Sequence, residues 1–142
     1  MKKRIEYEQK TSLNSDWVRK QMAHFMEEDV PNGDLTTEAI VAASTLVIAQ
    51  INSGEDFIFC GASVIPYCFP ESCKIGIKIE DGQQVNSGVT LATITGFASD
   101  ILTYERVSLD LVKRLCGIST ETKKYCDLNL PINFKVMDTR QT

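Results

Sequence analysis

The chain has 142 residues, with 15 Lys and Arg against 19 Asp and Glu, so its formal net charge at pH 7 is -4. This balance argues against a general nucleic-acid-binding protein, which would carry a basic surface. The apolar content of 43% and the charged content of 24% are typical of globular proteins that dissolve in water. No run approaches the roughly 18 apolar residues of a membrane span, so we expect no membrane partner.

The first part of the chain is predicted to be helical. Apolar side chains recur at helical spacing over residues 14–29. The turn-forming run at 31–34 ends this helix, and residues 35–38 start a further short turn. We interpret Asp29 and Asp34 as residues that shape this turn, with catalysis a lesser possibility. The predicted amino-terminal caps are Asn14 or Ser15 for the helix and Thr36 or Thr37 for the turn.

The middle of the chain is rich in β-branched residues and partly alternates between apolar and polar side chains, which predicts β-strands. The strictest alternation covers residues 73–80. We expect residues 61–69 to form a helix that ends before Pro70, and residues 81–88 to form two glycine-containing turns. The predicted strands and short apolar pieces are residues 44–52, 57–61, 73–80 and 90–96.

The period of the apolar residues changes from strand to helix after residue 97. Residues 98–115 are predicted to form a long helix, and Ser119 or Thr120 can cap a second helix that runs to about Cys126. A last strand is predicted over 134–138. This order predicts an α+β fold for the first hundred residues, with an α/β unit beginning afterwards.

The last predicted strand leads directly into Asp138, Thr139 and Arg140. In α/β proteins, charged residues at the carboxyl end of a strand commonly present themselves to an anionic ligand. A site at this position needs more chain to close it. We therefore expect the site to be incomplete within the printed sequence.

The long helix is predicted to be covered on two sides. Its apolar residues span an arc of about 220° when they are placed at roughly 100° per residue, which is wider than a surface helix needs. Glu105 falls inside this arc and Arg106 falls at its edge. A buried carboxylate must be paired or hydrogen-bonded. Glu105 therefore either fixes two helices together or holds Arg106 towards a ligand. The apolar residues are Ile101, Leu102, Tyr104, Val107, Leu109, Leu111, Val112 and Leu115.

The cysteines and the amino terminus indicate the cellular compartment. The five cysteines are odd in number and form no C-x-x-C pair, so we expect reduced thiols and no cysteine-bound metal. The first eight residues are charged and lack the apolar core of a signal peptide. Both observations favour a cytoplasmic protein.

Five segments, taken in order, resemble the quinolinate phosphoribosyltransferase family, whose members are also called nicotinate-nucleotide pyrophosphorylases (carboxylating). No single segment is decisive, but together they extend over most of the chain. Members of the family are about twice as long as this sequence. The matching segments are Glu28-Asp29-Val30-Pro31-Asn32-Gly33-Asp34-Leu35-Thr36-Thr37, residues 81–88, residues 101–109, residues 117–122 and Asp138-Thr139-Arg140.

The resemblance implies a glycosyltransferase of NAD and pyridine nucleotide biosynthesis. Family members join quinolinate to phosphoribosyl pyrophosphate with Mg²⁺, and they release pyrophosphate and CO₂ to give nicotinate mononucleotide. They are homodimers or higher homo-oligomers in which an amino-terminal α/β sandwich-like domain covers the partner's α/β barrel. On this basis residues 1–112 are expected to form the amino-terminal domain, and residues 113–142 the truncated start of the barrel.

The resemblance also implies a set of substrate-binding residues. Arg106 matches the arginine that reaches the substrate site of the other subunit, with Glu105 in support. Thr139 and Arg140 match the Thr-Arg-Lys cluster that binds the dicarboxylate and phosphoribosyl groups. Gln141 replaces the family's lysine, which removes a positive charge and predicts weaker binding or altered specificity. The catalytic residues and the Mg²⁺ ligands are expected beyond residue 142, so the chain alone is expected to be inactive.

Three alternative functions remain open at this stage. One is a paralogue of the family that is linked to molybdenum transport, which Gln141 favours slightly. Another is a biotinyl or lipoyl carrier domain, because residues 81–96 resemble its hairpin. The carrier would need a lysine in a tight turn, whereas the candidates Lys74 and Lys78 lie within a predicted strand. The third is a fragment that acts only as a dimerisation module.

Overall fold

The computed structural model describes residues 12–128 and Val136. Its elements combine helices with an antiparallel sheet, which agrees with the predicted α+β class. The predicted strand over 134–138 lies outside the described residues apart from Val136. Among the helices of the described part, none is both long and apolar enough to cross a membrane.

The first helix is confirmed, with one difference in the segment that follows. Helix α1 covers Ser15–Asp29, and the Asn14 side chain accepts a hydrogen bond from the backbone N–H of Trp17 at 2.9 Å. Helix α2 covers Leu35–Ile40, and its cap is Asp34, so the predicted cap at Thr36 or Thr37 is wrong. The carboxylate of Asp34 accepts hydrogen bonds from the backbone N–H and the hydroxyl of Thr37. It therefore satisfies one of the free backbone donors at the helix start, and the two threonines become part of the helix.

The main sheet has three antiparallel strands in the order β1-β5-β3. These strands cover Leu46–Asn52, Thr90–Phe97 and Lys74–Ile77, respectively. A second sheet pairs β2 (Phe57–Ile58) with β4 (Gln84–Val85). Strand β4 lies between two glycine turns and is too short to produce a visible alternation in the sequence. Its partner is also remote in the chain, which explains why it was not predicted.

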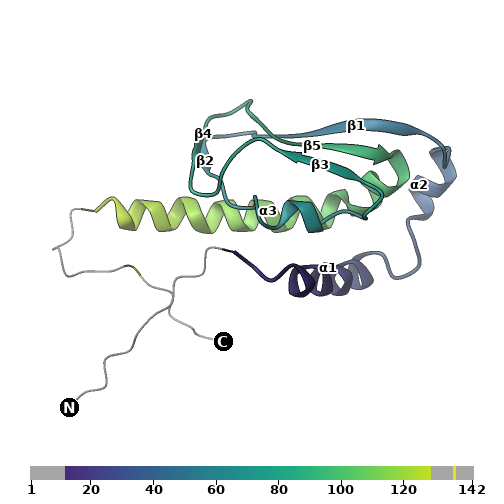
Figure 1. The fold of residues 1–142 in the computed structure, drawn as a ribbon, viewed down its shortest axis with the longest axis horizontal. Coiled ribbons are helices and arrows are strands. Elements are labelled where there is room, and N and C mark those ends of the chain that lie inside the picture. Colours follow the sequence, from purple (N-terminus) through teal and green to yellow (C-terminus); the bar gives the residue numbers. More distant parts are fainter. Residues whose placement is uncertain (1–11, 129–135, 137–142) are drawn as a thin grey trace, which may run out of the picture.

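One face of the main sheet is covered and the other is open. Along β1, residues Val47, Ala49 and Ile51 are half-buried, whereas the residues between them are exposed. Figure 1 shows the long helix α3 running along the covered face, with α1 on the far side of α3. The half-buried residues of β1 pack into the hydrophobic core next to α1, α3 and the 3-10 helix η1 (Ile65–Tyr67). This single turn of helix is all that forms where a helix over 61–69 was predicted, and Pro66 lies at its start.

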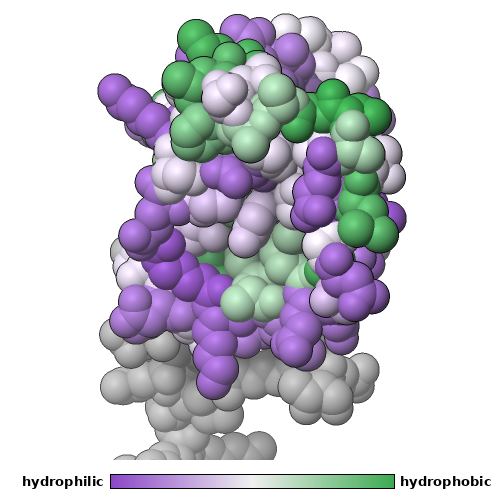
Figure 2. All heavy atoms as spheres, turned by 90° about the vertical axis from the view of Figure 1, so that its right-hand side faces the viewer, coloured by the Kyte–Doolittle hydropathy of each residue, from purple (hydrophilic) through white to green (hydrophobic). Residues whose placement is uncertain are grey.

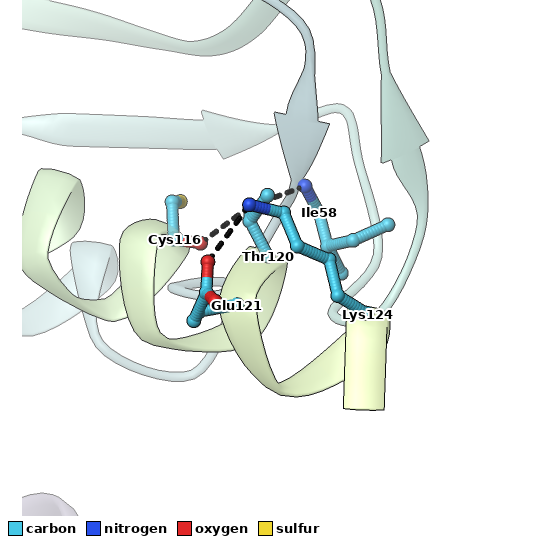
Figure 3. Close-up of polar contacts among 5 residues, drawn as sticks. All are labelled: Ile58, Cys116, Thr120, Glu121 and Lys124. Carbon is cyan, nitrogen blue, oxygen red and sulfur yellow. Dashed lines mark hydrogen bonds and ion pairs between the residues drawn. The ribbon is translucent and has the colours of Figure 1, made fainter. Parts of the chain in front are cut away.

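Helix α3 covers Ala98–Cys126 without interruption, so the predicted division into two helices is wrong. Thr120 was expected to cap the second helix. Its hydroxyl instead donates to the backbone carbonyl of Cys116 at 2.7 Å and accepts from the backbone N–H of Ile58 at 2.9 Å (Figure 3). Thr120 thereby ties α3 to β2. The predicted domain boundary between residues 112 and 113 would fall inside this helix, and it stays a prediction.

The hydrophobic core consists of two clusters that share α3. One cluster joins α1 to the start of α3 through Val18, Met22 and Ile101. The other lies under the later part of α3, where Val112 and Cys116 pack with Phe59. Phe59 is fully buried. Ser108 is 1% exposed, and its hydroxyl lies within hydrogen-bond distance of the carbonyls of Tyr104 and Cys68, which offsets the cost of burying this polar group. Together the clusters hold α3 in a fixed position, from which it presents its remaining side chains.

Candidate functional site

Arg106 presents its guanidinium on the exposed side of α3. Its side chain is 70% exposed, and Asp29, the last residue of α1, is its ion-pair partner. The Nε atom donates to Asp29 Oδ2 at 3.1 Å, and Nη2 lies 2.7 Å from Oδ1. The two groups are 77 residues apart in the chain, and the packing of α1 against α3 brings them together.

A polar groove of about 520 Å³ lies beside this ion pair. Its wall is the connection between α1 and α2, residues 29–36, and its other side is formed by Leu102, Thr103 and Arg106 of α3. Figure 2 views the molecule from the end that carries α2, and it shows hydrophobic side chains gathered in patches between hydrophilic ones. The large apolar residues exposed on α2 and at the start of β1 are Leu35, Ile40, Leu46 and Ile48.

The groove contains more negative than positive charge. Hydrogen bonds from the hydroxyl and backbone N–H of Thr37 hold the pKa of Asp34 below its usual value, so this carboxylate is ionised at neutral pH. The charged residues that line the groove are two carboxylates, Asp29 and Asp34, and one cation, Arg106. An anionic ligand bound at Arg106 would need further cations from outside the groove.

The structure places Glu105 differently from the sequence analysis. Glu105 is exposed, so the prediction that it lies on a buried face is wrong. Cys116 lies about three turns further along nearly the same side of the helix, only about 20° away, and it is buried because Cys60 contacts it. The covering of α3 is therefore uneven along its length, which a helical wheel does not show. Within the described part of the chain, the carboxylate that pairs with Arg106 belongs to Asp29.

Three of the predicted substrate-binding residues, Thr139, Arg140 and Gln141, lie outside the described residues, as does Asp138. Their position relative to Arg106 stays a prediction. The described residues contain no group of three or more His, Cys, Asp or Glu side chains that could hold a metal ion.

Asp29 is the site residue that the sequence analysis missed, because it was interpreted as part of a turn. A signal for it exists in the sequence. Glu27, Glu28 and Asp29 form the carboxyl-terminal end of α1, and no basic residue lies in the last turn. The helix dipole disfavours negative charge at this end. An acidic end without local compensation indicates a cation from elsewhere in the fold.

Two larger grooves contain none of the predicted site residues. One, of about 700 Å³, lies between α1 and α3 and includes Asp110, Lys113 and Arg114. The other, of about 690 Å³, lies between the end of β1 and the later part of α3, with Lys124 at its edge. Lys124 is paired with Glu121 at 2.8 Å (Figure 3), and this pairing raises its pKa. Both grooves mix acidic and basic side chains.

The comparison with protein families matches residues 34–116 to the model of the quinolinate phosphoribosyl transferase N-terminal domain. This chain belongs to the quinolinate phosphoribosyltransferase family. The matched residues begin at the cap of α2 and end in the later part of α3, so they contain the sheet and Arg106 but not Asp29.

Curated relatives extend the similarity over most of the chain. The chain is 32% identical to a probable nicotinate-nucleotide pyrophosphorylase (carboxylating) of Bacillus subtilis, over 92% of this chain and 46% of the relative. It is also 32% identical to the nicotinate-nucleotide pyrophosphorylase (carboxylating) of Mycobacterium leprae, over 89% of this chain and 47% of the relative. The chain thus spans about half the length of the curated relatives it matches.

Solved structures show the same fold. NadC from Streptococcus pyogenes superposes with a TM-score of 0.86 at 26% sequence identity, over 94% of this chain and 48% of that structure. The fold assignment therefore agrees with an amino-terminal portion of this family. A free-standing carrier domain is not favoured, because the similarity covers α1, the sheet and α3 together.

Proposed function

We propose that this chain is the amino-terminal part of a quinolinate phosphoribosyltransferase and that Arg106 binds a carboxylate of quinolinate. The observation that supports this most is the exposed guanidinium of Arg106 at a polar groove, in a chain that belongs to this family. The proposed reaction joins quinolinate to phosphoribosyl pyrophosphate. It releases pyrophosphate and CO₂ and gives nicotinate mononucleotide for NAD synthesis.

The charge of the groove supports a site that this segment completes only in part. Quinolinate carries two carboxylates, whereas the groove offers one guanidinium beside two carboxylates of its own. Thr139, Arg140 and Gln141 are proposed to supply further contacts, and a guanidinium at Arg140 suits a carboxylate because it can bind both oxygens. Mg²⁺ is proposed to assist the departure of pyrophosphate, with ligands from beyond residue 142.

A homodimer, or a multiple of it, is proposed as the working form. Leu35, Ile40, Leu46 and Ile48 are each more than two-thirds exposed, and burial against a partner would remove this apolar surface from water. In such a dimer Arg106 would serve the partner's site. We also propose a cytoplasmic location, which fits the five cysteines being free thiols in the structure.

The proposed role of Arg106 is tested in a version of the protein extended past residue 142. Arg106→Ala is expected to raise the KM for quinolinate roughly tenfold to hundredfold, because a charge-assisted, two-point contact is lost. The thermal unfolding midpoint should change little, since the guanidinium is mostly exposed. Steady-state kinetics and a thermal melt provide the two readouts.

Arg114→Ala is the matched control, because it removes the same charge from an exposed position two turns further along α3. It should leave the KM unchanged. Normal quinolinate binding by Arg106→Ala would show that the assignment of Arg106 is wrong. Calorimetric titration of quinolinate into the 142-residue chain should show no binding, and tight binding would contradict the proposal of an incomplete site.

The molybdenum-linked paralogue is the less favoured alternative. The relatives described above carry the name of the quinolinate enzyme, and the chain shares the Glu105-Arg106 pair that the resemblance assigns to it. Gln141 is the residue that favours the paralogue. Activity of the extended protein with quinolinate and phosphoribosyl pyrophosphate would decide between the two.

A further inference from the structure

We infer that Asp29 is a positioning residue that holds the guanidinium of Arg106 from the side, so that the far edge of the guanidinium stays open to a carboxylate of the ligand. The inference rests on the proposed function, because it concerns the same arginine. It assigns a role to a residue that precedes residues 34–116, which the family model matches, and to which the resemblance gives no role in substrate binding.

The geometry of the ion pair carries the inference. A guanidinium has two edges that can each bind a carboxylate at two points, one formed by Nε and Nη2 and the other by Nη1 and Nη2. Asp29 occupies the first edge, with distances of 3.1 Å from Nε to Oδ2 and 2.7 Å from Nη2 to Oδ1. The second edge retains one N–H group of Nη1 and one of Nη2. Arg106 can therefore bind a second carboxylate without releasing the first.

The burial of the two side chains fits these different roles. Asp29 is 23% exposed and Arg106 is 70% exposed, so the carboxylate is the more fixed member of the pair. Asp29 lines both the groove beside α2 and the groove between α1 and α3, which places it in the wall between them. A long, exposed arginine samples many rotamers when nothing holds it. Pairing in the wall removes much of that freedom before the ligand arrives.

Asp29 is unfavourable for the stability of helix α1, which also indicates a role beyond stability. Three acidic residues end α1 at the negative pole of its dipole, and this placement is unfavourable for the helix itself. The long-range contact with Arg106 compensates for Asp29. Local conflicts of this kind, in which a charge is unfavourable for its own helix but pairs with a ligand-binding group, are expected near functional sites.

Asp29→Asn tests the inference, because the loss of charge and the loss of positioning predict opposite changes in the affinity for quinolinate. Asp29→Asn removes a negative charge close to the ligand, so electrostatics alone predicts tighter binding of the quinolinate dianion. Loss of positioning predicts weaker binding. We expect the KM for quinolinate to rise roughly tenfold, with kcat and the KM for phosphoribosyl pyrophosphate changed by less than about twofold. Asp110→Asn, which removes the same charge from an exposed pair on α3, should change none of these.

A double-mutant cycle separates positioning from a purely structural role. In the Arg106→Ala background, Asp29→Asn should have no further effect on the KM for quinolinate, because its target is gone. An equal loss in both backgrounds, or tighter or unchanged binding by Asp29→Asn alone, would overturn the inference. These outcomes leave the proposed function intact. An Arg106→Ala variant with a normal KM would instead remove the proposed function and the inference together.

The pair can also be observed without ligand in the 142-residue chain. In ¹⁵N–¹H spectra, the Nε–H of Arg106 should give a separate signal that exchanges slowly with water, and Asp29→Ala should abolish it. Arg114 serves as the internal comparison, because it is also exposed but pairs with no carboxylate among the described residues. An Arg106 signal that survives in Asp29→Ala would contradict the side-on pairing, whatever the kinetics show.

Discussion

Among the polar contacts that tie α3 to the rest of the molecule, two are built differently. Near the carboxyl end, the neutral hydroxyl of Thr120 binds the backbone of β2 beside a core that includes Phe59 and Cys116. Nearer the amino end, the charged pair of Arg106 and Asp29 lies at the surface beside an acidic groove. The first region uses burial and satisfied backbone groups. The second uses exposed charge.

This difference indicates which part of α3 supports the fold and which part presents a ligand-binding group. Buried contacts contribute most to the free energy of unfolding, whereas exposed ion pairs contribute little. Substitutions around Thr120 should therefore reduce stability, and those around Arg106 should reduce ligand binding with stability preserved. The following predictions test the comparison, in order of decreasing expected effect on stability.

The largest effect is expected from Phe59→Ala. Phe59 is fully buried beneath the later part of α3, so the substitution leaves a cavity in the core. We expect the free energy of unfolding to fall by about 3–5 kcal/mol, measured by urea denaturation followed by circular dichroism. Leu13→Ala is a suitable control, because Leu13 is 49% exposed. A loss below that of the control would show that this cluster is not the main support of α3.

A smaller loss is expected from Thr120→Val, which keeps the shape of the side chain and removes its hydroxyl. The backbone N–H of Ile58 then loses its acceptor. We expect the free energy of unfolding to fall by about 1–3 kcal/mol. Thr120→Ser keeps the hydroxyl and should retain most of the stability. Equal losses for both variants would show that the methyl group, and not the hydrogen bond, ties α3 to β2.

Gly117→Ala is expected to stabilise the protein. Gly117 lies inside the continuous helix, and an added Cβ would meet no atom within 4 Å. Alanine is favoured over glycine in a helix by about 0.5–1 kcal/mol, so the thermal midpoint should rise. Gly82→Ala is the contrasting control, since Gly82 has a φ of +87° that alanine adopts with strain. A destabilised Gly117→Ala would indicate two helices that break at this glycine.

The smallest effect concerns the pH dependence contributed by Asp34 at the acidic groove. Hydrogen bonds from Thr37 lower its folded-state pKa below the usual 3.8. A lowered pKa stabilises the folded state above the unfolded pKa, and this contribution is lost as the pH falls through the folded pKa. The difference in thermal midpoint between the native protein and Asp34→Ala should therefore be constant above about pH 5. It should shrink as the pH is lowered towards 2, and a difference that grows on acidification would contradict this sign.

Much of the fold was predictable because its signals are local. Helix α1 follows from its periodicity and its cap at Asn14, and strands β1 and β5 follow from β-branched residues and partial alternation. The continuous α3 was missed because Ser119 and Thr120 have the local pattern of a helix cap. The hydroxyl of Thr120 instead contacts β2, which lies about 60 residues earlier in the chain.

The candidate site was predictable only in part. Arg106 was assigned by resemblance, and the structure shows it exposed at a groove. Its partner was assigned to the adjacent Glu105 and is Asp29 instead, because that pairing depends on how α1 packs against α3. A wheel gives the angle of a side chain around its helix. It does not show which other elements pack against that side at each position along the helix. The exposure of Glu105 depends on those neighbours.

Because α3 is continuous, it fixes the distance and the rotation between Arg106 and the end of the helix at Cys126. At 1.5 Å per residue, the 20 residues from Arg106 to Cys126 span about 30 Å of unbroken helix. The helix therefore keeps Arg106 at a fixed distance from the residues after Cys126. Inserting one residue between them would turn the two ends by about 100° relative to each other, whereas inserting seven would nearly restore the phase and add about 10 Å. We expect this segment to tolerate substitutions more readily than single insertions or deletions.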